Sequence, residues 1–383
     1  MVAVILFLVF LFGAAPTVSG TPQKSFAQIA KQADAARIAD RVSDAIQLYS
    51  EGVRLRPSWS EGWWSLGSLL YDQDRFPEAQ AAFRRFAAIA TKPGPAYAFL
   101  ALCEYESYEY QLALEHFEMW GRKGSPGTAE LIDVAGFHWA LLLTREGRFP
   151  EALYLLAGKA QKLGRSPALV EAMGLASLRM TNLPEDYPQE RRELVWLAGE
   201  AAFYSAVHEH EREEEYANKL LIHYNQEPNV HYFRGTLLGF QKERAEAAKE
   251  YQQELQLSPQ HVPAMVELAL VQIDDFNATE GAAMAVRAVA LDPKNSRAQF
   301  ALGRALLETD RFQESAGHLE IAKRLAPDSA PIRFALAKDY RALGRTKEAE
   351  RESAAFLSLK AKNDVLAPTQ QKNGRREQAG PPR

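Results

Sequence analysis

Prolines at a fixed spacing constrain the fold of this chain more than any other feature of its sequence. Pro259, Pro293 and Pro327 stand 34 residues apart. Small residues recur at the same step within this stretch: Ala247, Gly281, Ser315 and Ala349. A fixed step of this length is typical of repeat architectures, in which each period forms one supersecondary unit. The sequence therefore predicts an array of short, similar units.

Each period contains two apolar runs of helical spacing, separated by a short polar turn. In the period that ends at Pro327, Asp310 lies in the turn, and the proline ends the second helix because it cannot continue the hydrogen-bond ladder. We predict that Gly303, Ser315 and Ala322 lie where the two helix axes come closest. Larger side chains at these three positions would overpack the contact.

This pattern resembles the tetratricopeptide repeat family in its small-residue positions, its tyrosine or phenylalanine on the second helix, and its closing proline. The resemblance covers about Ser25 to Lys360, with one break. It implies an all-α fold, an α-α superhelix of about eight to nine helix pairs with one irregular unit in the middle. Such repeats bury their apolar faces only against neighbours, so several must stack. In the family, the inner groove of the stack usually binds a peptide or a protein.

The phase of the repeat divides the chain into predicted segments. Residues 25–180 form an N-terminal repeat block and residues 194–360 a C-terminal repeat block. Residues 181–193 interrupt the period as an irregular insertion, because two prolines prevent this connection from being helical throughout. Residues 361–383 are polar, basic and proline-bearing, and we expect a disordered tail there.

Residues 1–20 predict a secretory signal peptide, since an apolar run from Met1 to Gly13 is followed by small residues. The run is too short to span a bilayer comfortably. We expect export across a bacterial inner membrane into the periplasm, with no integral membrane span after removal of the signal. No Lys or Arg precedes the apolar core, so an uncleaved N-terminal anchor or a misassigned start is the alternative.

Composition and motifs favour a protein without catalytic activity. The 383 residues are 47% hydrophobic and 25% charged, with a formal net charge of -4, and this weak acidity gives no argument for a nucleic-acid partner. No zinc-protease helix, phosphate-binding loop, nucleophile elbow or dinucleotide fingerprint occurs in the sequence. We therefore predict that the protein is not an enzyme and uses no cofactor and no metal.

Two features that could carry chemistry have simpler explanations. His208 and His210 are two residues apart, so on a helix they would point to different sides and suit one metal ion poorly. A solvated junction between helices accounts for them better. Cys103 is the only cysteine, so it forms no internal disulfide, and we predict that it is a small buried hydrophobic residue.

The resemblance places a partner-binding groove on the first helices of the pairs. The predicted groove residues are mostly aromatic or basic: Trp64, Tyr71, Tyr105, Phe137, Asn229, Tyr232, Phe300, Arg304, Phe334, Lys338 and Arg341. Aromatic and arginine side chains are common energetic anchors of protein interfaces, so this lining suits a peptide or a partner helix. Each ring could equally pack within or between repeats. Arg304 and Lys338 are less easily buried.

The sequence is consistent with three alternative functions. The first is a non-enzymatic scaffold that binds a peptide or partner protein in the concave groove. The second is an envelope-assembly or structural component that acts through its convex face. The third is an enzyme with a site at the irregular unit, where acidic residues gather with a tyrosine: Glu185, Asp186, Tyr187, Glu190 and Glu193. The identity of the partner is not predicted by the sequence.

Overall fold

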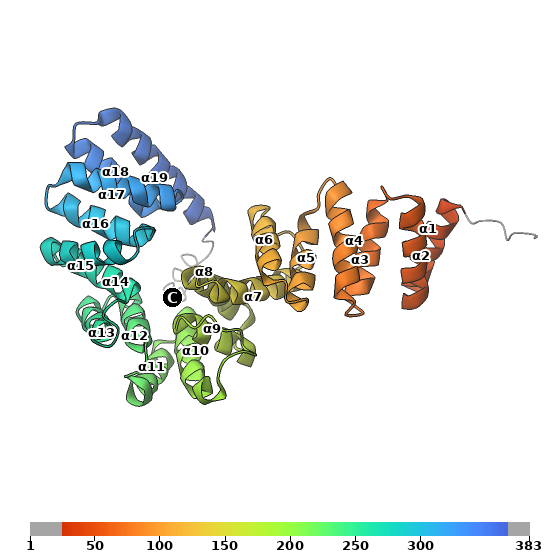
Figure 1. The fold of residues 1–383 in the computed structure, drawn as a ribbon, viewed down its shortest axis with the longest axis horizontal. Coiled ribbons are helices and arrows are strands. Elements are labelled where there is room, and N and C mark those ends of the chain that lie inside the picture. The colour runs from red at the N-terminus through yellow and green to blue at the C-terminus, as the bar shows by residue number, and fades with distance from the viewer. Residues whose placement is uncertain (1–24, 367–383) are drawn as a thin grey trace, which may run out of the picture. The chain divides into compact units, whose positions relative to one another are not determined.

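The structure is a computed structural model that describes residues 25–366. Every regular element in that range is a helix, which confirms the predicted all-α class, and Figure 1 shows successive helices lying alongside one another. The predicted signal peptide, residues 1–20, lies outside the described residues. Residues 367–383 of the predicted tail also lie outside them. Among the described helices, none is both long enough and apolar enough to cross a bilayer.

The chain divides into two compact units at Leu142 and Leu143, within the seventh helix. Unit 1 contains α1 (Phe26–Ile38), α2 (Val42–Leu55), α3 (Ser60–Tyr71), α4 (Phe76–Ile89), α5 (Gly94–Glu106), α6 (Tyr110–Arg122) and most of α7 (Ala129–Arg145). Unit 2 begins with α8 (Phe149–Leu163), α9 (Pro167–Ser177), the short 3-10 helix η1 (Gln189–Arg191), α10 (Arg192–Ala206) and α11 (His210–Tyr224). It continues with α12 (Val230–Phe240), α13 (Arg244–Leu257), α14 (Val262–Asp274), α15 (Ala278–Leu291), α16 (Ser296–Glu308), α17 (Phe312–Leu325), α18 (Ala330–Ala342) and α19 (Thr346–Leu366).

The same reverse turn ends α9 and each helix that begins a helix-turn-helix unit, ten first helices in all, and a similar turn at Gly124 follows α6. In each turn one residue is left-handed, and the N–H of the next residue donates to a carbonyl five residues earlier, which satisfies the end of the helix. After α16, for example, Asp310 has a φ of 59°, and the Arg311 N–H donates to the Leu306 carbonyl at 2.9 Å. The left-handed residues are Asp40, Asp74, Tyr108, Gly147, Arg179, His208, Lys242, Phe276, Asp310 and Gly344.

Nine of the ten turns lead directly into a second helix, and α9 is the exception. The described residues therefore hold eight helix-turn-helix hairpins within the two units, one further turn between α7 and α8 at the unit boundary, and one additional first-type helix, in agreement with the predicted eight to nine pairs and one irregular unit. Within a hairpin the predicted close approach is present, because the Ser315 hydroxyl of α17 donates to the Gly303 carbonyl of α16 at 2.9 Å. A Cβ atom at Gly303 would come within 2.6 Å of Leu319 Cγ.

The loop at residues 178–188 is followed by η1 and then by α10, which packs directly on α9. Two glycines make this contact reciprocal. A Cβ atom at Gly174 of α9 would lie 2.0 Å from the Val195 carbonyl oxygen of α10, and one at Gly199 would lie 1.9 Å from the Val170 carbonyl oxygen. Only hydrogen at the Cα fits there, so α10 takes the place beside α9 that a second helix takes in the regular hairpins.

The last helix is longer than the sequence predicts. We expected a disordered tail from residue 361, and the structure extends α19 to Leu366, six residues past Lys360. No proline or glycine lies between Lys360 and Pro368, so no helix-breaking residue ends α19 at Lys360.

One buried carboxyl group interrupts the apolar core of the last hairpin. Asp339 of α18 is 0% exposed, and neither of its carboxylate oxygens has a hydrogen-bond partner among the described residues. Burial raises the pKa of Asp339 to about 6. The equivalent residue one period earlier is Ala305, which is equally buried and uncharged. Because a buried carboxylate without hydrogen-bond partners is unfavourable, Asp339 lowers the stability of this hairpin.

We expect Gly174→Ala to lower the free energy of unfolding by roughly 1 to 3 kcal/mol, because the added methyl group must push α9 away from α10. Urea denaturation of the full chain measures this change. Gly158→Ala in α8 is the matched control, since a Cβ atom there meets nothing within 4 Å, and it should raise stability by about 0.5 to 1 kcal/mol. Equal effects of the two substitutions would contradict the close contact.

We expect Asp339→Ala to raise the free energy of unfolding at pH 7 by up to about 3 kcal/mol, since a buried charge is removed. Folding raises the pKa of this group from 3.8 to about 6. The folded state therefore binds a proton more tightly, and wild-type stability gains from this group as the pH falls from about 7 to 4. Urea denaturation at several pH values should show that gain in the wild type and not in the variant. The exposed Asp328→Ala serves as control, and an unchanged pH slope in Asp339→Ala would contradict the assignment.

Candidate functional site

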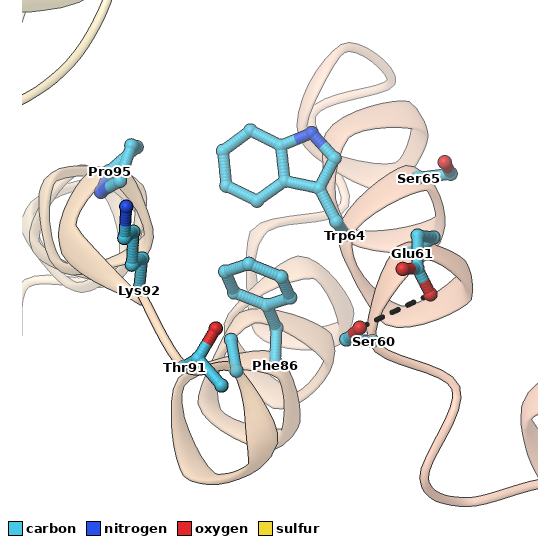
Figure 2. A pocket seen from close by; sticks show the side chains of 9 residues that line it. Ser60, Glu61, Trp64, Ser65, Phe86, Thr91, Lys92 and Pro95 are labelled. Atoms are coloured by element: carbon cyan, nitrogen blue, oxygen red, sulfur yellow. Dashed lines mark hydrogen bonds between the residues drawn. The ribbon is translucent and has the colours of Figure 1, made fainter.

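A hollow of about 420 Å³ opens in unit 1 where α3, α4 and α5 meet (Figure 2). Its lining residues are Ser60, Glu61, Trp64, Ser65, Phe86, Ala90, Thr91, Lys92 and Pro95. Trp64 and Phe86 both point toward it from neighbouring helices, and Lys92 and Pro95 lie across from the indole. The hollow thus has an aromatic floor and a polar rim, which is the usual character of a small ligand pocket.

The aromatic floor is fixed by a cluster of rings. The Trp64 ring centroid lies 5.1 Å from that of Phe86 and 5.5 Å from those of Phe83 and Phe99. Phe83 and Phe99 are themselves stacked at 4.9 Å. Rings at these separations pack favourably edge to face or offset. The cluster therefore holds the Trp64 indole in place before any ligand arrives.

The rim carries one acidic and one basic residue. The Ser60 hydroxyl donates to Glu61 Oε2 at 3.2 Å, at the start of α3. Lys92 is exposed in the short loop before α5 and makes no ion pair with any residue that the structure describes. Because α5 begins at Gly94, the positive end of its helix dipole lies close to the lysine in the chain. This side of the rim therefore favours a negatively charged group.

The local sequence explains why the hollow exists. α4 ends at Ile89, and the small Ala90 follows in an extended conformation. Pro93 and Pro95 then start α5, since proline is tolerated where the first N–H groups of a helix have no partner. The small side chain of Ala90 leaves the space between Phe86 and Pro95 open.

The other aromatic residues predicted for the groove in unit 1 pack against their neighbours. Tyr71 lies edge-on to Phe76 and Phe99, and burial raises its pKa to about 12. Tyr105 packs against Tyr110 at 5.4 Å and against His138 at 4.7 Å, and Phe137 also contacts His138, at 5.8 Å. Of the four predicted residues in this unit, the structure brings Trp64 to the hollow.

Two predicted groove residues of unit 2 form the junction between α12 and its neighbours. Asn229 has a φ of 71°, and its N–H donates to Glu254 Oε1 at 3.0 Å. Its side-chain oxygen accepts a hydrogen bond from His261 Nε2 at 2.8 Å. The Tyr232 N–H donates to the second oxygen of Glu254 at 3.2 Å, and burial raises the pKa of the Tyr232 hydroxyl. These contacts hold the start of α12.

The basic residues predicted for the C-terminal groove form ion pairs within unit 2. Arg304 Nη2 lies 2.8 Å from Asp274 Oδ1, and Lys338 Nζ lies 2.8 Å from Glu308 Oε1. Both pairs join residues 30 positions apart on successive first helices. The offset is the 34-residue period less about one helical turn, so the two partners face each other across adjacent repeats. Their positive charge is therefore largely balanced within the protein.

The remaining predicted groove residues lie near the end of the array. Phe300 of α16 packs against the clusters on both sides of it. Phe334, one period later, is 54% exposed and lies 5.3 Å from Phe356 of α19, ring centroid to ring centroid. Together with Arg341, whose Nη2 donates to Ser353 Oγ at 2.6 Å, these two rings line a second hollow of about 210 Å³.

The two hollows share a pair of rings at equivalent positions of their repeats, although their other lining residues differ. Phe86 follows Trp64 by 22 residues, and Phe356 follows Phe334 by the same number. After Phe300 the corresponding position is Ala322, which is fully buried. Our prediction missed Phe86, Ala90 and Lys92 because it considered only first helices. The signal that could have found Phe86 is an aromatic residue at a second-helix position that is small in the regular repeats.

The other sequence candidates have structural roles. His208 is the left-handed residue of its turn and His210 begins α11, where its Nδ1 lies 3.1 Å from Glu213 Oε2. Within residues 25–366 no cluster of three or more His, Cys, Asp or Glu side chains could hold a metal ion. At the irregular unit, Glu185, Asp186 and Glu190 are exposed, and Glu193 accepts a hydrogen bond from the Tyr224 hydroxyl at 3.0 Å.

Tyr187, the aromatic residue among these acidic residues, has a structural role. Its ring is buried, and its hydroxyl donates to Glu171 of α9. Burial, followed by this hydrogen bond to a carboxylate, raises the pKa of Tyr187 to about 12. The tyrosine thus anchors the loop to α9, and proton transfer from it near neutral pH is disfavoured.

Comparison with known proteins supports the repeat family over part of the chain. The family model for the tetratricopeptide repeat matches residues 31–95 and residues 277–330, one segment in each unit. These two segments carry the signature of that repeat. No curated protein matches the chain.

Two solved structures are similar to part of this chain. MamA, from residue 41 to its end, from Desulfovibrio magneticus RS-1, is 17% identical with a TM-score of 0.40, over 45% of this chain and 98% of that one. YrrB, described as a TPR protein with an unusual peptide-binding site, is 16% identical with a TM-score of 0.37, over 45% of this chain and 88% of that one.

Cys103 of α5 should be chemically inert in the folded protein. It is fully buried, as the sequence predicts, and burial raises its pKa to about 12. Since the thiolate is the reactive form, we expect no reaction with a thiol reagent such as DTNB at pH 8 until the protein is denatured. One equivalent should then react. Rapid labelling of the native protein, with circular dichroism unchanged, would contradict this placement.

Proposed function

We propose that this protein is a non-enzymatic scaffold that binds a segment of a partner protein at the hollow between α3, α4 and α5. The observation that carries the proposal is the pair of half-buried rings, Trp64 and Phe86, that face about 420 Å³ of open space from adjacent helices. Half-buried aromatic side chains held in place by their own packing are strong anchors for a partner side chain. The predicted resemblance to peptide-binding repeats supports the same function.

The shape and charges of the hollow indicate what it would accept. An apolar side chain of an extended segment would enter between the two rings, where it loses contact with water. Lys92 at the rim would then meet an acidic residue beside that apolar one. The ion pairs of Arg304 and Lys338 favour unit 1 over the basic face of unit 2 as the principal site, because those cations already have carboxylate partners.

The place of action is also part of the proposal. Export to a bacterial periplasm rests on the apolar sequence of residues 1–20 alone. A convex-face function in envelope assembly is the alternative, and it would depend on none of the hollow's residues.

A peptide-display selection on the full chain tests the proposed site. We expect the selected peptides to share an apolar residue next to an acidic one. Ala90→Phe, which fills the hollow, should weaken their binding at least tenfold, since a buried apolar side chain contributes about 1.5 to 3 kcal/mol. Lys92→Glu should select against the acidic residue. Isothermal titration calorimetry with the selected peptides measures both effects.

Two matched substitutions control for indirect effects. Ala88→Phe adds the same ring on the exposed side of α4, and Lys31→Glu makes the same charge change on exposed α1. Neither should change peptide affinity. If peptides bind Ala90→Phe as tightly as the wild type, the hollow is not the site, and the convex face becomes the better candidate.

A further inference from the structure

Arg179 of unit 2 is a half-buried cation held among aromatic rings. It is the left-handed residue of the turn that ends α9, with a φ of 55°. Its guanidinium carbon lies 4.5 Å from the ring centroid of Phe149, at the start of α8, and 5.6 Å from that of Tyr232 on α12. The side chain thus joins three elements of unit 2. Cation–π contacts of this kind stabilise an arginine but leave its net charge uncompensated.

Other arginines over aromatic rings in unit 2 have a carboxylate partner. Four such groups, each written as arginine, ring and carboxylate, are Arg165, Trp196 and Glu200; Arg212, Tyr204 and Glu209; Arg304, Phe300 and Asp274; and Arg345, Tyr340 and Glu348. Arg179 forms no ion pair with any residue that the structure describes. In unit 1, Arg56 over Phe26 is also unpaired, but it is exposed, so water can solvate it.

The carboxylates that act on Tyr232 and His261, two groups on which Arg179 also acts, are already engaged. Glu254 accepts hydrogen bonds from the Asn229 and Tyr232 N–H groups, at 3.0 and 3.2 Å. Glu267 accepts two hydrogen bonds from Arg297, at 2.7 and 2.8 Å. Neither carboxylate can turn to Arg179 without breaking these contacts. The protein therefore supplies no counter-charge of its own.

His261, a further titratable group beside this cluster, is held neutral. Its Nδ1 accepts a hydrogen bond from the Ala264 N–H at 3.0 Å, so Nε2 carries the proton and donates to Asn229 Oδ1 at 2.8 Å. Burial lowers the pKa of His261; the Glu254 carboxylate opposes this, and the charge of Arg179 adds to the lowering. The histidine is thus neither an anion for Arg179 nor a second cation, and Arg179 differs from the neighbouring Arg297 in having no carboxylate partner among the described residues.

The phenolic oxygen of Tyr232 is the polar group in contact with Arg179, and burial lowers the pKa of the guanidinium in spite of that contact. A desolvated charge without an opposite partner is unfavourable, and a bound anion would relieve that cost. The side chain is partly exposed, so a ligand can reach it. A guanidinium presents parallel N–H donors that match the two oxygens of a carboxylate.

We propose that Arg179, with Tyr232 and Phe149 beside it, forms a binding site for a carboxylate group supplied by a ligand. The ligand carboxylate would pair with Arg179 in the way that the Glu200 carboxylate pairs with Arg165. It comes either from a small organic acid or from an acidic residue of a peptide, and both sources offer the same two oxygens. The site lies in unit 2 and shares no residue with the hollow of unit 1, so it goes beyond the proposed scaffold function and does not depend on it.

Calorimetric titration of the full chain with two probes tests the proposal. The probes are sodium acetate and a short capped peptide with a single glutamate, each compared with sodium chloride at equal ionic strength. We expect at least one probe to bind and to raise the melting temperature of the wild type. Arg179→Met, which keeps an unbranched side chain against the rings without charge, should abolish both effects. Acetate binding would identify a small-acid site, whereas binding of the peptide alone would identify an acidic peptide site.

Two further variants make the test decisive. Arg345→Met removes another ring-stacked arginine of unit 2, one whose partner Glu348 is partly exposed, and it should leave probe binding unchanged. Arg179→Lys keeps the charge but loses the two parallel donors, so it should bind about tenfold more weakly, and it can be used if Arg179→Met does not fold. The proposal is overturned if neither probe binds the wild type, or if Arg179→Met, or Arg179→Lys in its place, binds as the wild type does.

Discussion

The reverse turn that ends each first helix is the constraint on which the rest of this structure depends. Its closing hydrogen bond, from the residue after the left-handed position to a carbonyl five residues back, occurs at the ends of ten first helices in the described residues. The bond fixes where the chain leaves the first helix, and thus where the second helix begins. Glycine is used at only two of these ten positions, so most turns hold a side chain in a conformation that costs about 1 kcal/mol or more. Stacking of neighbouring hairpins must offset that cost, which ties each turn to the array.

The irregular unit shows what happens when the turn is kept and the following helix is not. α9 ends in the same turn as the other first helices, at Arg179, yet the chain then makes a proline-containing loop. Burial of the α9 face is restored by α10, which approaches so closely that Gly174 and Gly199 admit no side chain. Because the regular second helix is missing, the turn residue itself faces neighbours from α8 and α12, and this is how Arg179 comes to lie between rings. The exception to the repeat thus creates a chemical environment that the regular hairpins do not contain.

The sequence predicts the repeating part of this fold well, because the 34-residue step carries the positions of turns, small residues and helix ends together. It predicts the candidate site less well. Trp64 was identified from its place on a first helix, but Phe86 and Lys92 come from a second helix and a loop, where the family pattern gives no guidance. The pairing of Arg304 with Asp274 depends on a side chain 30 residues away, and a count of basic residues on one helix does not show it. Whether an aromatic ring lines a hollow or fills the core, as for Trp64 and Tyr71, depends on neighbours from two further helices. The close contact of α9 with α10 depends on matching glycines across an irregular loop, which a periodic argument passes over.

The ion pairs between successive first helices have a mechanical consequence. Arg297 with Glu267, Arg304 with Asp274, and Lys338 with Glu308 connect α14, α16 and α18 in series along unit 2. Inside each hairpin, by contrast, α16 and α17 are joined by close packing around Gly303, which salt does not screen. Exposed charge pairs weaken as ionic strength rises, because the screening length falls to about 8 Å at physiological salt and shorter beyond it. The ion-pair contribution to the contacts between these repeats is therefore weaker in concentrated salt than in dilute buffer, so bending between repeats becomes easier. The packing inside each hairpin is unaffected.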